Sequence, residues 1–526
     1  MAVPHFSPRD LLLIFLFILL AVLVWGNFYN NQSNHALYNP DAYSFAVAAR
    51  EVVDGNGFQT KSLILPQLDY LKKTGRSVLQ WDSLYNFPLP VLMMSLLFLI
   101  FGVSDFSISL SAGIFYFLSV PLAYLIARKR CNRTVASLTT LAFVLFPHIL
   151  RYSISGLTEL PSIFFTLLLL YLFTIEPNRL NLILGGMTLG LFYLNRHTSL
   201  LFLPVFLAFI YQANPQEKRR GWVYFCIPFL LLMLPWLWHM FKTAGNPFFH
   251  LGASILVPNE TSLFPNFHAN LYPYYLSPIE FMLKYPGLVF IKYLKESFFL
   301  NWVLFALFLA LRKNLVKFDR LFLWLFFLVA LIQPLFGNNP RYYALFAPLV
   351  LMYIIGMVEK WLRKYSFVGP VLRLVFLGVV ILAVCFSSLE SVWGGYLGIK
   401  EPGRGSGMVE HKLENMAILK AWVDRDKLTA TNISSEVAWY ADCRALTLPP
   451  DPDSLTEFEQ DYGLSIDQIY LSIGLHMPGL TPPGWAKWEA VRQTGQLAGY
   501  QVKHRFPNGS MFLTREVDET IPLDTL

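Results

Sequence analysis

Carboxylates and cations follow several apolar runs of this sequence, at points where a membrane crossing would end. Asp41 comes after the first long apolar run, and Glu159 lies in the stretch SGLTELPS. Ionisable groups at membrane depth are costly and are usually functional. The other candidates are cations and neighbouring polar groups of the same loops and helix ends: Lys72, Lys73, His148, Arg151, Arg196, His197, Arg341 and Tyr342.

This set of side chains suits the transfer of a group from a phosphate-linked lipid donor to a hydroxyl or an amine. The acceptor needs a carboxylate that takes its proton. The donor needs cations that bind its phosphate and stabilise it as it leaves. A second carboxylate can orient the acceptor or hold a divalent metal. Asp41 and Glu159 are therefore the predicted catalytic pair. Whether these two carboxylates also hold a Mg or Mn ion is left open by the sequence.

The stretch 38–58, YNPDAYSFAVAAREVVDGNGF, is typical of a short helix with defined ends. Asn39 suits the N-cap, Pro40 suits the first helical position, and Gly55 and Gly57 suit the stop. Asp41 then lies in the first turn, where the helix dipole favours an ionised carboxylate. The alternative is that Asp41 is only a favourable first-turn charge.

The remaining candidates also have structural alternatives. Glu159 could cap the helix that follows it, because Thr158 and Glu159 precede Pro161. Arg196 and Arg341 could be long side chains that reach from helix ends to the interface.

The composition is that of a membrane protein. Hydrophobic residues make up 55% of the 526 residues and charged residues only 14%, against roughly 25% in a soluble domain. Although the net charge is +7, the Lys and Arg residues cluster in short loops between apolar runs, as in cytoplasmic loops. The sequence contains no nucleic-acid-binding motif, so we expect no nucleic-acid partner.

We predict an all-α polytopic domain with about eleven transmembrane helices, the N-terminus in the cytoplasm and the C-terminus outside. This topology follows from placing the basic segment 128–133 on the cytoplasmic side. Two short runs, 88–101 and 285–295, are predicted to lie along the membrane surface, since about 14 residues span it poorly. The predicted crossings are 11–27, 107–126, 134–150, 161–174, 181–195, 200–211, 222–239, 298–311, 321–335, 344–358 and 372–387.

The composition changes near residue 389. Residues 1–388 are predicted to form the transmembrane catalytic domain, with a first outer loop at 27–105. Residues 389–526 are predicted to form an extracytoplasmic α/β domain without a glycine-rich phosphate loop. Its predicted helices are 409–424 and 485–494, and its predicted strands are 428–433, 445–448, 468–472, 500–506 and 510–514.

Several segments, in this order, resemble the GT-C superfamily of membrane glycosyltransferases, above all the protein O-mannosyltransferases and the lipid A aminoarabinose transferases. They are DAYSFAVAAREVVDGNGF with Asp41, FGVSDFSISLSAGIFYFLSVPLAYLIARK, GLTELPSIFF with Glu159, NNPRYYALFAPLVLM with Arg341 and Tyr342, and VAWYADCRALTLPP. The chain departs from the family twice. Asn86-Phe87-Pro88-Leu89-Pro90 stands where the family often has His-Pro-Pro, and no second acid adjoins Asp41.

The resemblance implies an inverting hexosyl- or pentosyltransferase of the bacterial cytoplasmic (inner) membrane. It would move a sugar from a polyprenyl-phosphate donor in the outer leaflet to a protein, lipid or glycan acceptor. Asp41 would be the general base, and Glu159 would orient the acceptor or help bind a metal. The expected phosphate-binding residues are Arg341, Arg196 and Tyr342, with Lys72 and Lys73 as weaker candidates, and those near the acceptor are Arg151, His148 and His197.

A lipid flippase or transporter of glycan assembly is the main alternative. Transporters often carry internal repeats and broken helices at the membrane midplane. This sequence has no evident repeat, and its ionisable residues gather toward one membrane face. A non-catalytic scaffold of glycan assembly is a third possibility, which the pair of carboxylates disfavours.

Overall fold

The computed structural model describes residues 7–31, 40–78, 81–174, 178–213, 218–248, 317–332, 344–364, 369–386, 412–449, 451–473 and 483–515. The chain divides into two compact units. The first, here called the helical unit, consists of Met1–Leu37, Phe87–Leu251 and Ser277–Glu401. The second, here called the sheet unit, consists of Tyr38–Asn86, Gly252–Leu276 and Pro402–Leu526. The predicted domain boundary after residue 388 stays a prediction.

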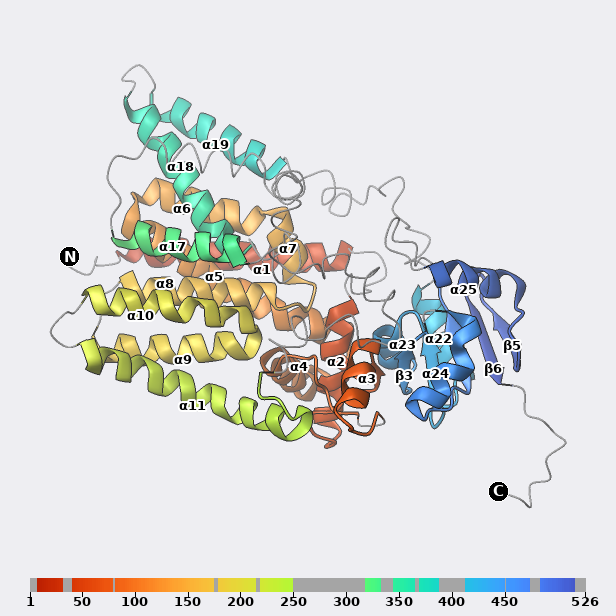
Figure 1. Ribbon diagram of the computed structural model, residues 1–526. Helices are drawn as coiled ribbons and strands as arrows, with labels where there is room; N and C mark the ends of the chain where they lie inside the picture. The colour runs from red at the N-terminus through yellow and green to blue at the C-terminus, as the bar shows by residue number, and fades with distance from the viewer. Residues whose placement is uncertain are drawn as a thin grey trace. The chain divides into compact units, whose positions relative to one another are not determined.

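The described part of the helical unit is built from helices alone (Figure 1). These are α1 (Pro8–Asn31), α4 (Pro88–Phe101), α5 (Asp105–Arg130), α6 (Arg133–Leu145), α7 (Pro147–Ser153), α8 (Glu159–Thr174), α9 (Arg179–Asn195), the 3-10 helix η2 (His197–Leu201), α10 (Phe202–Ala213), α11 (Lys218–Ala244), α17 (Lys317–Ile332), α18 (Ala347–Lys364) and α19 (Pro370–Phe386).

Within the described residues, four helices are long and apolar enough to cross a membrane, so the chain is a membrane protein. They lie in Pro8–Asn31, Asp105–Arg130, Arg219–Ala244 and Ala344–Lys364. The predicted crossing 134–150 consists of two helices, α6 and α7, bent by 56° where Pro147 interrupts the backbone hydrogen bonds; together they would be a fifth span. The predicted total of eleven stays a prediction, because 285–295 and 298–311 lie outside the described residues.

Helix α4 has the bounds that the sequence predicts for the first surface helix. Pro88 takes the first helical position, where a missing N–H costs nothing. Gly102 ends the helix with a φ of 83°, in the left-handed region that favours glycine. Ser104 then caps α5 by accepting a hydrogen bond from the Ser107 N–H at 3.3 Å.

The basic segment 128–133 is held by buried carboxylates from neighbouring helices. Asp10 of α1 is 1% exposed and accepts hydrogen bonds from Arg133 Nε at 3.0 Å and from the Tyr124 hydroxyl at 2.8 Å. Asp319 of α17 is equally buried and accepts one from Arg130 at 2.7 Å. The loop therefore ties α1, α5, α6 and α17 together at one end of the unit.

Helices α9 and α11 approach each other unusually closely. A Cβ atom added to Gly186 would lie 2.0 Å from the backbone oxygen of Phe225, and one added to Gly190 would lie 3.3 Å from that of Phe229. Glycines spaced four residues apart lie on one helix face and let a second backbone come near, as in membrane helix pairs. This crossing places the end of α9, which leads directly into Arg196.

The sheet unit combines both ends of the chain. Its described elements are α2 (Pro40–Val53), β1 (Ser62–Leu63), α3 (Leu65–Lys73), α22 (Lys412–Trp422), β2 (Thr429–Thr431), α23 (Ser434–Tyr440), β3 (Ala445–Thr447), the 3-10 helix η6 (Pro452–Ser454), α24 (Leu455–Tyr462), β4 (Gln468–Leu471), α25 (Pro483–Thr494), β5 (Tyr500–Arg505) and β6 (Met511–Arg515).

The strands form a six-stranded sheet in the order β1-β3-β2-β4-β6-β5. The first four are parallel and the last two pairings are antiparallel. Strands β2 to β6 coincide with the five segments predicted from the sequence. Strand β1 was not predicted: it comes from the segment between α1 and α4 and pairs in parallel with β3, Ser62 opposite Ala445.

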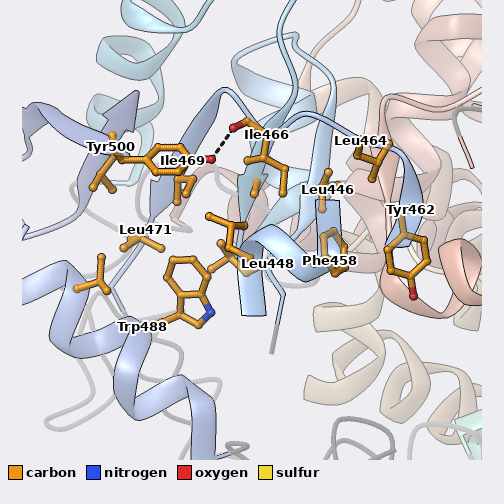
Figure 2. Packing of buried hydrophobic residues seen from close by; sticks show 14 of the residues in the cluster. Leu446, Leu448, Phe458, Tyr462, Leu464, Ile466, Ile469, Leu471, Trp488 and Tyr500 are labelled. Atoms are coloured by element: carbon orange, nitrogen blue, oxygen red, sulfur yellow. Dashed lines mark hydrogen bonds between the residues drawn. The ribbon is translucent and has the colours of Figure 1, made fainter. Parts of the chain in front are cut away.

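An apolar core joins the sheet to its helices (Figure 2). Trp488 of α25 belongs to this core and donates from its indole N–H to the backbone oxygen of Pro449 at 2.8 Å. The Tyr500 hydroxyl donates to the backbone oxygen of Ile466, so this buried phenol is also satisfied. Leu63 and Leu68, from the segment between α1 and α4, belong to the same core.

Candidate active site

Asp41 lies where the sequence predicts it, in the first turn of α2. Pro40 opens the helix, and Gly55 and Gly57 follow its end with φ angles of 85° and 76°. Residue 39, the predicted N-cap, lies outside the described residues. The Asp41 side chain is exposed, whereas Tyr43 and the alanines of the next two turns are buried. A carboxylate at this position is accessible and benefits from the dipole of its helix.

In the helical unit, the predicted residues Glu159 and Arg196 form a buried ion pair. An oxygen of Glu159, Oε1, lies 3.2 Å from Nη2 of Arg196, and their side chains are 2% and 7% exposed. Glu159 is the first residue of α8, and Arg196 follows the last residue of α9. The positive end of the helix dipole and the guanidinium both attract the Glu159 carboxylate.

Three residues that the sequence analysis did not propose for the site hold this ion pair in place. The side-chain amide of Asn195 donates to the backbone oxygen of Thr158 at 3.0 Å and to the Ser162 hydroxyl at 2.8 Å. These bonds fasten the end of α9 to the start of α8, one residue away from each member of the pair. The run Asn195-Arg196-His197 at the end of an apolar segment is the signal that could have revealed Asn195.

The His197 ring packs against two aromatic rings. Its ring centroid is 4.9 Å from that of Phe87 and 4.7 Å from that of Tyr193, and the side chain is 6% exposed. Phe87 directly precedes α4 and stands in the segment where the related enzymes often carry His-Pro-Pro. In this chain a histidine from η2 therefore lies beside that segment.

His148 and Arg151 both belong to α7, the short helix before the Glu159 loop. Both side chains are partly buried. The His148 ring centroid lies 6.1 Å from that of Phe146, the residue that caps α7. The Ser155 hydroxyl donates to the backbone oxygen of Tyr152 at 2.7 Å and shapes the turn between α7 and Glu159.

The structure describes the side chains of some, but not all, of the predicted phosphate-binding residues. Lys72 belongs to the sheet unit, where its Nζ lies 3.2 Å from Asp461 and 5.2 Å from the ring centroid of Tyr462. The side chain of Lys73, and all of Arg341 and Tyr342, lie outside the described residues. Of the cations predicted from the sequence to bind phosphate, Arg196 is thus the one that the structure places beside a predicted carboxylate.

The described residues do not assemble a metal centre. No group of three or more His, Cys, Asp or Glu side chains among them could hold a metal ion. Asp41 belongs to the sheet unit and Glu159 to the helical unit. The Glu159 carboxylate is also engaged by Arg196.

The fold and its charged residues agree with the resemblance to GT-C membrane enzymes that the sequence predicts, and comparison with known proteins confirms that resemblance. Residues 87–239, which include the Glu159–Arg196 pair, match the family model of dolichyl-phosphate-mannose-protein mannosyltransferase. A protein of Aquifex aeolicus (strain VF5), described only as uncharacterized, is 27% identical over 316 residues, 59% of this chain and 70% of its own length.

Two solved structures share the fold along nearly the whole chain. ArnT from Cupriavidus metallidurans, bound to undecaprenyl phosphate, is 13% identical with a TM-score of 0.55, covering 97% of this chain and 99% of ArnT. The oligosaccharyltransferase of Archaeoglobus fulgidus in its apo form is 12% identical with a TM-score of 0.60, covering 97% of this chain and 75% of that one. The same archaeal enzyme, AglB, has been solved with an inhibitory peptide and a dolichol-phosphate.

Proposed function

We propose that this protein is a glycosyltransferase of the GT-C type that takes its sugar from a polyprenyl-phosphate-linked donor. The observation that carries the proposal is the buried Glu159–Arg196 pair, which lies inside the segment matched by the mannosyltransferase model. The similar enzymes ArnT and AglB were solved with undecaprenyl phosphate and dolichol-phosphate, which supports a lipid-phosphate leaving group here. The buried ion pair would otherwise be a costly feature for a membrane helix bundle.

The reaction is a single displacement at the anomeric carbon. The Asp41 carboxylate takes the proton of the acceptor hydroxyl or amine while the acceptor atom attacks that carbon. The bond between this carbon and the phosphate oxygen breaks, and polyprenyl phosphate leaves with the electron pair. Because attack and departure occur on opposite faces, the configuration of the sugar is inverted. Asp41 is regenerated when its proton passes to solvent, to which its side chain is exposed.

Arg196 stabilises the phosphate as negative charge develops on it, together with Arg341 and Tyr342. A guanidinium suits this role because it stays charged and donates two parallel hydrogen bonds to phosphate. Glu159 holds Arg196 in position before the donor arrives, besides its predicted role in orienting the acceptor. Lys72 and Lys73 remain weaker candidates, because Lys72 already pairs with Asp461.

We further propose that the reaction takes place at the outer leaflet of a bacterial cytoplasmic membrane, with the N-terminus inside and the sheet unit outside. The basic loop 128–133 supports this orientation, since short loops rich in Lys and Arg remain in the cytoplasm. The acceptor is a protein, a lipid or a glycan in the same compartment.

The test is release of polyprenyl phosphate by the purified protein from a panel of polyprenyl-phosphate sugars. Asp41→Asn should lower the rate by about 10² to 10⁴, the usual contribution of a general base. Asp54→Asn, just beyond the other end of α2, is the matched control and should leave the rate unchanged. Repeating the assay with a chelator then shows whether a divalent ion takes part.

Two results would contradict the proposal. If Asp41→Asn is as active as wild type, Asp41 is only a first-turn charge and the base lies elsewhere. If wild type turns over no donor but moves the lipid across vesicle membranes, the chain is a flippase.

A further inference from the structure

Helix α2 is fastened to the C-terminal part of the sheet unit through Arg50. Its Nη1 donates to the backbone oxygen of Trp439 at 2.9 Å, and its Nη2 donates to that of Ala438 at 2.7 Å. The guanidinium also lies over the Trp439 ring, 5.2 Å from the centroid. These carbonyls belong to the last turn of α23, where backbone oxygens lack partners and the helix dipole attracts a cation. Arg50 therefore caps α23 from another helix.

Asp442 completes the attachment from the other side. One oxygen, Oδ1, lies 3.1 Å from Nη2 of Arg50 and 2.8 Å from Nζ of Lys61. Lys61 in turn lies 3.2 Å from Glu51. Positive and negative charges therefore alternate along the series Arg50, Asp442, Lys61 and Glu51, which begins and ends on α2. Burial raises the pKa of the Asp442 carboxyl, but the hydrogen bond from Lys61 and the nearby cations lower it by more, so it stays ionised.

The turn that carries Asp442 has an uncommon backbone conformation. Asp442 has a φ of 56°, and among the described residues it is the one non-glycine residue with a positive φ. A left-handed backbone is uncommon for residues other than glycine, and Asp is among the few side chains that tolerate it. The turn after α23 places the Asp442 carboxylate against two cations from the first outer loop.

Further contacts attach this loop near Asp41 and beyond the end of α2. The hydroxyls of Tyr43 and Tyr440 lie 2.9 Å apart, and Tyr43 is fully buried two residues from Asp41. Beyond the helix, the Ser62 hydroxyl lies 3.2 Å from that of Ser434 as β1 joins the sheet. Helix α2 and the strand that follows it are therefore integral parts of the sheet unit.

We propose that the segment 437–444, VAWYADCR, is the attachment site of α2. Arg50 and Asp442 are then positioning residues for Asp41. The proposal rests on the role of Asp41 as general base given above. Asp41 lies in the first turn of α2, so a displacement of this helix moves its carboxylate. A misplacement of about 1 Å at a reacting group can cost about 10²-fold in rate. A C-terminal segment of the chain thus sets the geometry of an N-terminal catalytic group.

The experiment compares Arg50→Gln, Asp442→Asn and the double variant in the full-length protein. We expect kcat for polyprenyl phosphate release to fall by about 10- to 100-fold, with KM for the donor unchanged, because neither residue contacts the donor. The double variant should lose little more than Arg50→Gln, since both changes break the same attachment. Arg50→Lys should be intermediate, because an ammonium cannot reproduce the fork geometry of a guanidinium.

Hydrogen exchange supplies a readout that does not depend on activity. Backbone amides of 40–53 should exchange faster in Arg50→Gln, while those of β4 keep the wild-type rate. Arg425→Gln is the matched control: Arg425 also lies beside Asp442, at 3.6 Å, but its side chain is 55% exposed. This change should alter neither kcat nor exchange in α2. If Arg50→Gln does not fold, the milder Asp442→Asn decides.

The two hypotheses fail in different ways. If Asp41→Asn is inactive but the Arg50 and Asp442 variants match wild type in kcat and in exchange, the proposed positioning of α2 by segment 437–444 is overturned. The proposed transferase function is then unaffected. If no donor is turned over, the proposed function fails, and faster exchange confined to α2 still supports the attachment. A uniform loss of protection across the sheet overturns it, because the residues would then serve only general stability.

Discussion

Among single side chains, the Glu159–Arg196 pair shows best what the sequence could and could not reveal. Each residue stands out alone, because a charge at the end of an apolar run is costly. Their pairing was not predictable, since 37 positions separate them and it depends on how α8 and α9 pack. The same applies to Arg50, whose backbone partners Trp439 and Ala438 lie 389 and 388 positions away.

The ion pair leads to a prediction about stability. Glu159→Ala leaves a buried guanidinium without its carboxylate and should lower the free energy of unfolding by about 3–5 kcal/mol. The double variant Glu159→Ala/Arg196→Met removes both charges and should recover part of that loss. Unfolding in mixed micelles measures both. If the double variant is no more stable than Glu159→Ala, the pair is not a coupled unit.

Among the helices, the sequence predicted where most elements lie and not how closely they pack. The bounds of α4 follow from its prolines and from Gly102, which are local signals. The break between α6 and α7 was missed, because apolar composition continues across Pro147 and masks the change in backbone direction. The close crossing of α9 and α11 depends on which faces meet, and hydropathy carries no such information.

That crossing predicts a strong effect of one methyl group. Gly186→Ala would place a Cβ atom against the backbone of α11, which cannot move aside as a side chain could. We expect a loss of about 1–3 kcal/mol in unfolding free energy, the usual cost of overpacking. Gly26→Ala in α1 is the control, because no atom lies within 4 Å of its added Cβ. Equal stability of the two variants would show that α9 and α11 are not in tight contact.

For the molecule as a whole, the predicted orientation is testable with reporters at two positions. An alkaline phosphatase fused to the C-terminus should be active, because it folds only outside the cytoplasm, where its disulfides form. The same enzyme fused after residue 131, in the basic loop, should be inactive. Activity measured in whole cells, normalised to expression, separates the outcomes. The opposite pattern would place the sheet unit in the cytoplasm and exclude a donor in the outer leaflet.

Local chemistry was enough to predict a membrane protein with a resemblance to GT-C enzymes, Asp41 at a helix start and the strands β2 to β6. Apolar runs, caps and alternating strands are properties of neighbouring residues, so they can be read along the chain. The tertiary structure alone decided that Glu159 pairs with Arg196, that β1 joins the C-terminal sheet and that segment 437–444 contacts α2. Such contacts join residues dozens to hundreds of positions apart, and they form only when packing brings distant segments together, because no local propensity encodes the partner.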